Sequence, residues 1–181
     1  MKKGILIATM VLVAAWCQAQ HFNASMASVM KSMKAYTLEM VELMPESSFD
    51  YRPVDSVRSF SEQVQHMIST NHFLLNHYLI DKQKGSRQEA GANAAKYAEK
   101  SSKTALLAVL GEQFDQTIAF FEKADVLLYD QTFTFGPVDK PIVKDYFTTS
   151  MLIRDHFTHH RSQLIVYLRL NDIEPAQFRP F

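Results

Sequence analysis

Helical periodicity dominates the pattern of apolar and polar positions along this chain. Between residues 22 and 44, apolar side chains recur every three or four positions, the spacing of one face of an α-helix. The members of this stripe are Met26, Val29, Met33, Tyr36, Met40 and Leu43. Proline disrupts a helix interior, so we expect the helix to end at Pro45.

A second stripe follows a polar connection over residues 46–58. Ser59 and Glu62 have the spacing of a capping box, in which the two side chains satisfy free backbone N–H groups at a helix start. The helix predicted from there to about Ile80 carries an apolar face of Phe60, Val64, Met67, Leu74, Leu75 and Tyr78. Residues 81–103 are rich in Lys, Gly, Ser, Ala and Gln, and we expect a long crossover that is helical over part of its length.

Two more helices are predicted after the crossover. The third helix carries a stripe of Leu107, Leu110, Phe114, Ile118 and Phe121. Residues 129–143 alternate in polarity around Gly136-Pro137, which favours an extended or hairpin-like loop across the end of the bundle. The fourth helix is predicted from about Asp145 to Asn171, with a stripe of Thr149, Leu152, Ile153, His156, His160, Gln163, Leu164 and Tyr167. We therefore predict an all-α fold, a four-helix bundle with a long crossover between helices 2 and 3.

The first nineteen residues differ from the rest of the chain. Two lysines precede an apolar run over residues 4–16, and Cys17-Gln18-Ala19 then offers small residues for cleavage before Gln20. This layout is typical of a secretory signal peptide, and the apolar run is too short to be a permanent membrane span. We predict a signal peptide over residues 1–19, one domain over residues 20–181, and an exported protein, periplasmic or secreted. An uncleaved membrane anchor is the alternative.

Composition narrows the function classes. The 19 basic residues balance the 19 acidic residues, so there is no excess positive charge to attract nucleic acid, and we expect no nucleic-acid partner. Cys17 is the only cysteine and would be lost with the signal peptide. A metal site in the mature protein would therefore use histidine and oxygen ligands.

The fourth helix carries the sharpest chemical pattern. His156 and His160 lie four residues apart on its predicted inward stripe, a spacing that lets two imidazoles converge on one metal ion, while His159 lies toward the flank. The alternatives for this pair are hydrogen-bonded core imidazoles and a solvated surface pair. Phe157 stands where a His-Glu-x-x-His metalloprotease has its catalytic glutamate, so this class is excluded.

A third ligand is less clear from spacing alone. His66 shares a helix face with Glu62 and His77, and periodicity does not choose between the two histidines or exclude that both are solvated. Glu62 is a weak candidate for a general base or for a hydrogen-bond partner of His66. Alternatively, Glu62 serves only to cap the helix, and we favour this role.

Two segments resemble motifs of the DinB-like (DinB/YfiT) superfamily. The segment Ser59–His66 resembles its second-helix motif, a serine, an apolar residue, and a histidine seven residues after the serine. The segment Asp155–Gln163, with the following stretch to Ile173, resembles its fourth-helix signature, and the opening helix and the connection from Pro45 to Pro53 also match. Ser162 and Asp172 depart from this pattern, because each replaces a usual glycine.

The resemblance implies a four-helix bundle, often a homodimer, with a divalent metal held by His66, His156 and His160. Zinc and nickel are the first candidates, although imidazole ligands do not identify the metal. Three histidines with an open position suit a metal-dependent hydrolase or transferase acting on a small-molecule substrate. One alternative is a non-catalytic bundle that binds metal or a small ligand. Another is a thiol-dependent S-transferase, which export disfavours because extracytoplasmic compartments are poor in reduced thiols.

Overall fold

The computed structural model describes residues 2–100, 102–135 and 139–179. Within these ranges the chain forms five α-helices, one π-helical segment and one two-stranded antiparallel sheet. The elements in chain order are α1 Lys2–Leu43, η1 Glu46–Ser48, α2 Phe60–Phe73, η2 Leu74–Ile80, α3 Arg87–Ala98, α4 Lys103–Lys123, η3 Val126–Leu128, β1 Thr132–Phe135, β2 Ile142–Asp145 and α5 Tyr146–Leu170. The fold is mostly helical, and the sheet corrects the prediction of an all-α fold.

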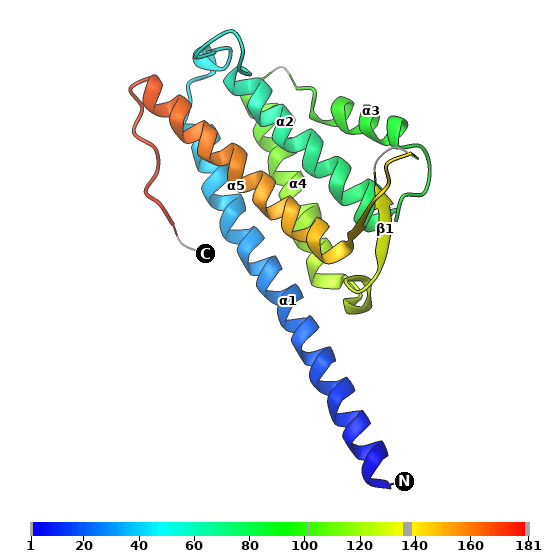
Figure 1. Ribbon diagram of the computed structural model, residues 1–181. Helices are drawn as coiled ribbons and strands as arrows, with labels where there is room; N and C mark the ends of the chain where they lie inside the picture. The colour runs from blue at the N-terminus through cyan, green and yellow to red at the C-terminus, as the bar shows by residue number, and fades with distance from the viewer. Residues whose placement is uncertain (1, 101, 136–138, 180–181) are drawn as a thin grey trace.

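Helix α1 runs without interruption from Lys2 to Leu43 and ends just before Pro45, as the sequence predicts. Its first part projects beyond the other helices, whereas its second part packs against α4 and α5 (Figure 1). Within the described residues, no helix combines the length and the apolar character that crossing a membrane requires.

The predicted capping box is present at the start of α2. Ser59 Oγ accepts the backbone N–H of Glu62, and Glu62 Oε2 accepts the backbone N–H of Ser59 at 2.7 Å. The helix then continues beyond Phe73 as the π-helical segment η2, so the helical stretch reaches Ile80 as predicted. Its predicted apolar face is buried throughout.

The crossover and the third predicted helix also agree with the pattern. Residues 87–98 of the crossover form α3, which packs mainly on α2. Helix α4 buries Leu110, Phe114, Ile118 and Phe121. Leu107 is only partly buried and Leu106 is buried in its place, so the apolar face is rotated slightly from the predicted one.

Strands β1 and β2 form a hairpin with the register Thr132↔Asp145 to Phe135↔Ile142. The Gly136-Pro137 pair of the predicted loop lies outside the described residues. Asp145 ends β2 and caps α5, because its Oδ1 accepts the backbone N–H of Thr148. The antiparallel pairing is consistent with the Thr, Phe, Ile and Val residues of both strands, which favour β-structure.

Helix α5 buries a face that differs in part from the predicted stripe. Ile153, Phe157 and Leu164 are fully buried, whereas Leu152 is 49% exposed. The stripe therefore centres on Phe157, and including Leu152 in it was wrong, because Leu152 lies more than a quarter of a turn away from Ile153 around the helix. Phe157 stacks on Phe114 of α4 with ring centroids 4.1 Å apart.

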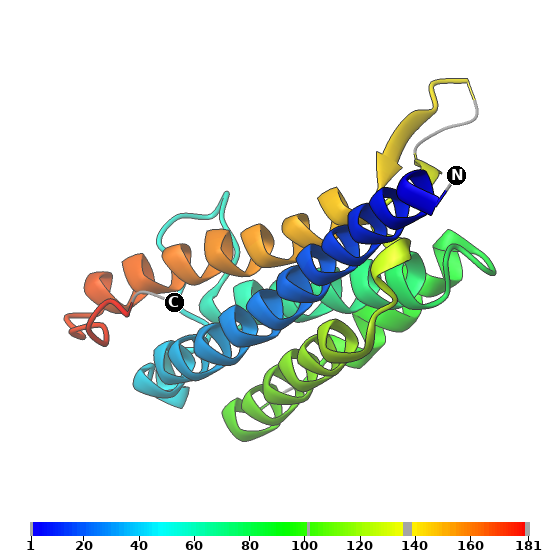
Figure 2. The ribbon, with the colours of Figure 1, turned by 90° about the horizontal axis from the view of Figure 1, so that it is seen from below.

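The four long helices pack in pairs around one apolar core. Helix α1 contacts α4 and α5, and α2 contacts the same two helices (Figure 2). The side chains that are completely buried include Phe60, Phe114, Phe121, Phe157, Met30, Met33, Met40 and Met67. Arg161 is also buried, with its guanidinium carbon 4.9 Å from the centre of the Tyr36 ring on α1.

Candidate metal centre

His66 is positioned by the start of α2. The capping box defines the first turn of the helix, and His66 lies seven residues after Ser59, two turns into α2. Its side chain is partly buried and points to α5, where its ring centroid lies 5.3 Å from that of His156 and 4.7 Å from that of His160. The sequence left His66 and His77 open as the third ligand, and the structure brings His66 to the pair.

His156 and His160 project from successive turns of α5, which lies beside α2 (Figure 1). Their ring centroids are 4.4 Å apart. His160 is only 5% exposed, whereas His156 is partly buried, as is His66. One ligand atom from each of the three histidines lies within 4.8 Å of the other two. We call His66, His156 and His160 the histidine cluster.

Polar side chains contact the Nδ1 atom of each ring. His160 Nδ1 lies 3.1 Å from Gln63 Oε1 and 3.0 Å from Gln163 Oε1. Both of these atoms are acceptors, so Nδ1 of His160 donates and its Nε2 carries a free lone pair. Asn71 Nδ2 lies 3.1 Å from His156 Nδ1, and Thr70 Oγ1 lies 3.5 Å from His66 Nδ1. A free lone pair on Nε2 therefore follows for His160 alone, because Asn71 Nδ2 is a donor, so that the neutral His156 ring accepts at Nδ1 and carries its proton on Nε2.

Gln63 and Asn71 are functional candidates that the sequence analysis did not single out. Both are buried polar residues on the inward side of α2, amid an otherwise apolar face. Gln63 Nε2 also donates to Gln163 Oε1 at 2.6 Å. A polar residue at an inward position of an apolar stripe was the signal that could have found them, because a buried polar group needs a hydrogen-bond partner.

Burial keeps the histidine cluster uncharged. It is the main cause that lowers the pKa of His156 to about 3 and the pKa of His160 to about 4, and neighbouring imidazoles add to both shifts. The pKa of His66 is also lowered, first by burial and then by the positive charge of Arg58. Neutral imidazole is the form that binds a metal ion, so the cluster is ready to bind one near neutral pH.

Glu62 does not act on the cluster in this structure. Its Oε2 accepts hydrogen bonds from the Ser59 N–H and, at 2.7 Å, from Nη2 of Arg52. These two contacts are the leading causes that lower the pKa of Glu62, which makes it a weak proton acceptor. The capping role that we favoured for Glu62 is therefore the one its contacts support.

The remaining histidines of α2, η2 and α5 lie elsewhere. His72 Nδ1 lies 3.0 Å from Gln113 Oε1, and its ring stacks on Tyr97. His77 is buried and stacks on Phe73, so a solvated position for it was wrong. His159 is exposed on the flank of α5, as the sequence predicts, and its Nε2 lies 3.0 Å from Gln163 Nε2.

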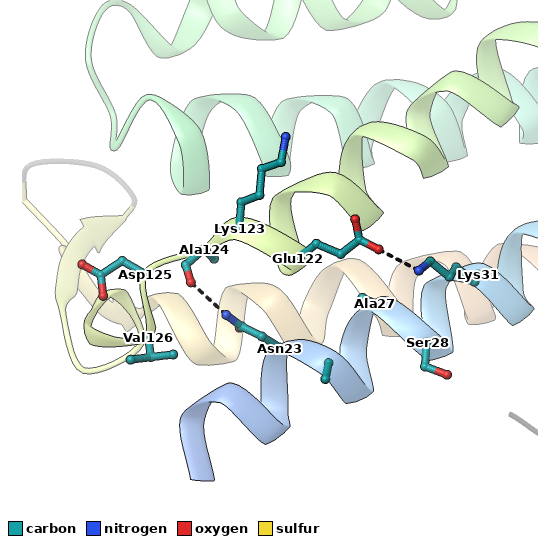
Figure 3. A pocket seen from close by; sticks show the side chains of 10 residues that line it. Asn23, Ala27, Ser28, Lys31, Glu122, Lys123, Ala124, Asp125 and Val126 are labelled. Carbon is teal, nitrogen blue, oxygen red and sulfur yellow. Dashed lines mark hydrogen bonds and ion pairs between the residues drawn. The ribbon is translucent and has the colours of Figure 1, made fainter. Parts of the chain in front are cut away.

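A large hollow lies away from the histidines. It has a volume of about 650 Å³ and runs between α1 and the end of α4 (Figure 3). Two polar contacts close part of it: Lys31 pairs with Glu122 at 2.6 Å, and Asn23 Nδ2 donates to the Ala124 carbonyl at 2.8 Å. Size therefore does not identify the functional site, and we base it on the chemistry of the histidine cluster.

Comparisons with known proteins agree with this geometry. The sequence profile of the DinB superfamily matches residues 30–164. A DinB-like protein from Bacillus subtilis has 20% identity and a TM-score of 0.61, over 87% of this chain and 96% of that one. A protein from Exiguobacterium sibiricum described as a candidate DinB family member has 19% identity and a TM-score of 0.62, over 90% of this chain and 95% of that one. No curated protein matches the chain.

At these identities the two solved structures establish a shared fold only. The profile match covers more than half of the chain and spans both helices that carry the histidine cluster. The chain therefore belongs to the DinB superfamily.

Proposed function

We propose that this protein binds a divalent metal ion through His66, His156 and His160. The observation that carries the proposal is the convergence of the three imidazoles, with one ligand atom from each within 4.8 Å of the others. Metal binding is also a general property of the DinB superfamily, to which the chain belongs. The second and fourth predicted helices contribute to one site, which a chance placement of histidines would not produce.

The residues present suit such an ion. Three neutral imidazoles match the nitrogen-rich coordination of zinc and nickel, the first candidates. The hydrogen bonds that His160 Nδ1 donates to Gln63 and Gln163 orient His160, and Asn71 contacts His156. His66 and His156 are partly exposed, which leaves the site accessible to a small molecule from solvent.

We propose a metal-dependent hydrolase or transferase as the activity. A metal held by three histidines with an open position can polarise a substrate or activate a bound water. The protein itself supplies orientation, because Gln63, Gln163 and Asn71 hold the rings whose nitrogens face the cluster.

A non-catalytic metal-binding protein is the second candidate. The observation that favours it is that no carboxylate joins the histidine cluster among the described residues, while Glu62 is engaged by Ser59 and Arg52. A general base for hydrolysis would then have to be an imidazole or a solvent species. Turnover that depends on the added metal supports the enzyme, and stoichiometric uptake without turnover supports the binding protein.

We further propose that the protein is exported, that residues 1–19 are removed, and that the four long helices are the four-helix bundle of a homodimeric protein. The projection of the first part of α1 beyond the other helices supports cleavage there, because its loss would leave the packed part of α1 in place (Figure 1). The pairwise packing of α1, α2, α4 and α5 supports the bundle.

Metal uptake by matched histidine variants tests the site. We expect His66→Ala, His156→Ala and His160→Ala each to abolish tight zinc binding in isothermal titration calorimetry. His159→Ala is the control, because His159 is an exposed histidine on the same helix as His156 and His160.

His72→Ala and His77→Ala should also leave zinc binding nearly intact, since these rings contact Gln113 and Phe73 instead. Circular dichroism verifies that each variant is folded. Zinc binding that survives in His66→Ala but is lost in His77→Ala would overturn the assignment of the third ligand.

A further inference from the structure

The charge balance of the histidine cluster sets the kind of ligand that it favours. The cluster consists of histidines alone, with no aspartate, glutamate or cysteine joining it among the described residues. Neutral imidazoles do not offset the charge of a divalent ion, so a metal bound here would keep its full positive charge. A partly buried site with uncompensated positive charge favours a negatively charged ligand.

The backbone of Arg58 lies where the start of α2 meets α5. It directly precedes the N-cap Ser59 of α2, and its carbonyl accepts a hydrogen bond from Tyr167 Oη of α5. His66 lies about two turns along α2 from this anchor, and His160 lies two turns before Tyr167 on α5, each about 10 Å along the helix axis. The anchor therefore sits at one end of the seam between the two helices, and a long side chain can extend along that seam toward the cluster.

The electrostatics agree with this placement. The positive charge of Arg58 is the second cause, after burial, that lowers the pKa of His66, and it is the last-ranked cause for His156 and His160. The same charge also lowers the pKa of Glu62. Arg58 is exposed, and within the described part of the chain no carboxylate forms an ion pair with it. Arg52 differs, because its Nη2 binds Glu62 Oε2 at 2.7 Å and its charge is thereby compensated.

We propose that the metal-loaded site takes a ligand bearing a carboxylate or phosphate group, which lies between the metal position and the guanidinium of Arg58. The proposal rests on the metal site proposed above and names its substrate class. Planar guanidinium suits this role, because its paired N–H groups match two oxygens of a carboxylate or a phosphate.

Anion titrations of the full-length protein test the proposal. The protein is loaded with Co²⁺, whose visible absorption spectrum responds to a change in its ligands, and is titrated with inorganic phosphate, acetate and the neutral analogue acetamide. We expect phosphate or acetate to change the spectrum saturably and acetamide to have no effect. Saturation by acetate alone assigns a carboxylate ligand, and saturation by phosphate alone assigns a phosphate ligand.

Two arginine variants identify the residue responsible. Arg58→Gln should raise the Kd of the bound anion by about ten- to a hundredfold, which is the effect of losing a charge-assisted hydrogen bond. Arg52→Gln is the matched control, since it removes a nearby arginine whose charge Glu62 already compensates. It should change the Kd less than twofold. The affinity for Co²⁺ itself should not fall in either variant, and circular dichroism confirms that both fold.

The outcomes separate this proposal from the one on which it rests. A wild-type protein that takes up no Co²⁺ overturns both. Normal Co²⁺ uptake with equal anion affinity in wild type and Arg58→Gln overturns the role of Arg58 and leaves the metal site standing. An equal loss in Arg52→Gln would reduce the effect to general surface charge and would also overturn the proposal.

Discussion

Desolvation of the histidine cluster predicts a specific dependence of stability on pH in the metal-free protein. Burial lowers the pKa of His156 to about 3 and of His160 to about 4, whereas the unfolded chain has the ordinary value near 6.5. Between these values the unfolded state binds more protons than the folded state. The free energy of unfolding must therefore rise with pH across this window and level off above about pH 6.5.

The size of the effect follows from the unfolded state. At pH 5.5 a histidine that stays neutral in the folded protein costs about 1.4 kcal/mol relative to pH 7.5, whether its folded pKa is about 3 or about 4. Two such residues would cost about 3 kcal/mol. Because His156 is partly exposed, solvent screening reduces this, and we expect about 2 kcal/mol from the pair.

Urea unfolding in the presence of a chelator measures this contribution. The wild-type protein should lose about 2 kcal/mol more stability between pH 7.5 and pH 5.5 than the double variant His156→Gln/His160→Gln. His159→Gln, which alters the exposed neighbour, should retain the wild-type pH dependence. An equal loss in the wild type and the double variant would refute the reasoning, because it would show that folding does not desolvate these two rings.

Three further predictions follow from single features. Asp172 adopts a φ of 56° at the end of α5, so Asp172→Gly should stabilise the protein by about 0.5–1 kcal/mol in urea unfolding, whereas Asp172→Ala should not stabilise it. Asn71→Asp replaces an amide that donates to His156 Nδ1 with a carboxylate that can accept the Nδ1 proton, which frees Nε2 for the metal and should strengthen zinc binding by calorimetry; an unchanged or weaker affinity would contradict this role. The intact mass of the exported protein should correspond to a chain that begins at Gln20, and a mass that still includes Trp16 would contradict cleavage.

Local physical chemistry accounts for the parts of the fold that were predictable. Pro45 ends α1, the capping box of Ser59 and Glu62 begins α2, and Asp145 begins α5, each at the position that its own backbone requirement sets. Apolar periodicity located the four long helices, because a helix in a core of this size must bury one face. The sequence also showed that Asp172 replaces a usual glycine near the end of the fourth helix. In the structure Asp172 adopts the left-handed conformation that favours glycine.

The π-helical segment η2 accounts for what helical periodicity missed about His77. His66 and His77 are eleven residues apart, three turns of a regular α-helix, which places them on one face. The chain enters the π-helical segment η2 at Leu74, where each turn holds more residues, and the shared face is lost before His77. His77 then packs on Phe73, while His66 meets α5.

By itself the sequence determined that α1 ends before Pro45, that α2 begins at its capping box and that His156 and His160 share a face. Through its resemblance to the DinB-like superfamily it also indicated which histidine would join them. Only the tertiary structure decided that Gln63 and Asn71 contact the rings, that Glu62 is engaged by Arg52, and that the charge of Arg58 acts on the cluster. The physical reason is that hydrogen-bond and charge partners depend on how α2 and α5 are rotated against each other. That rotation is set by the packing of the whole core, and no single helix encodes it.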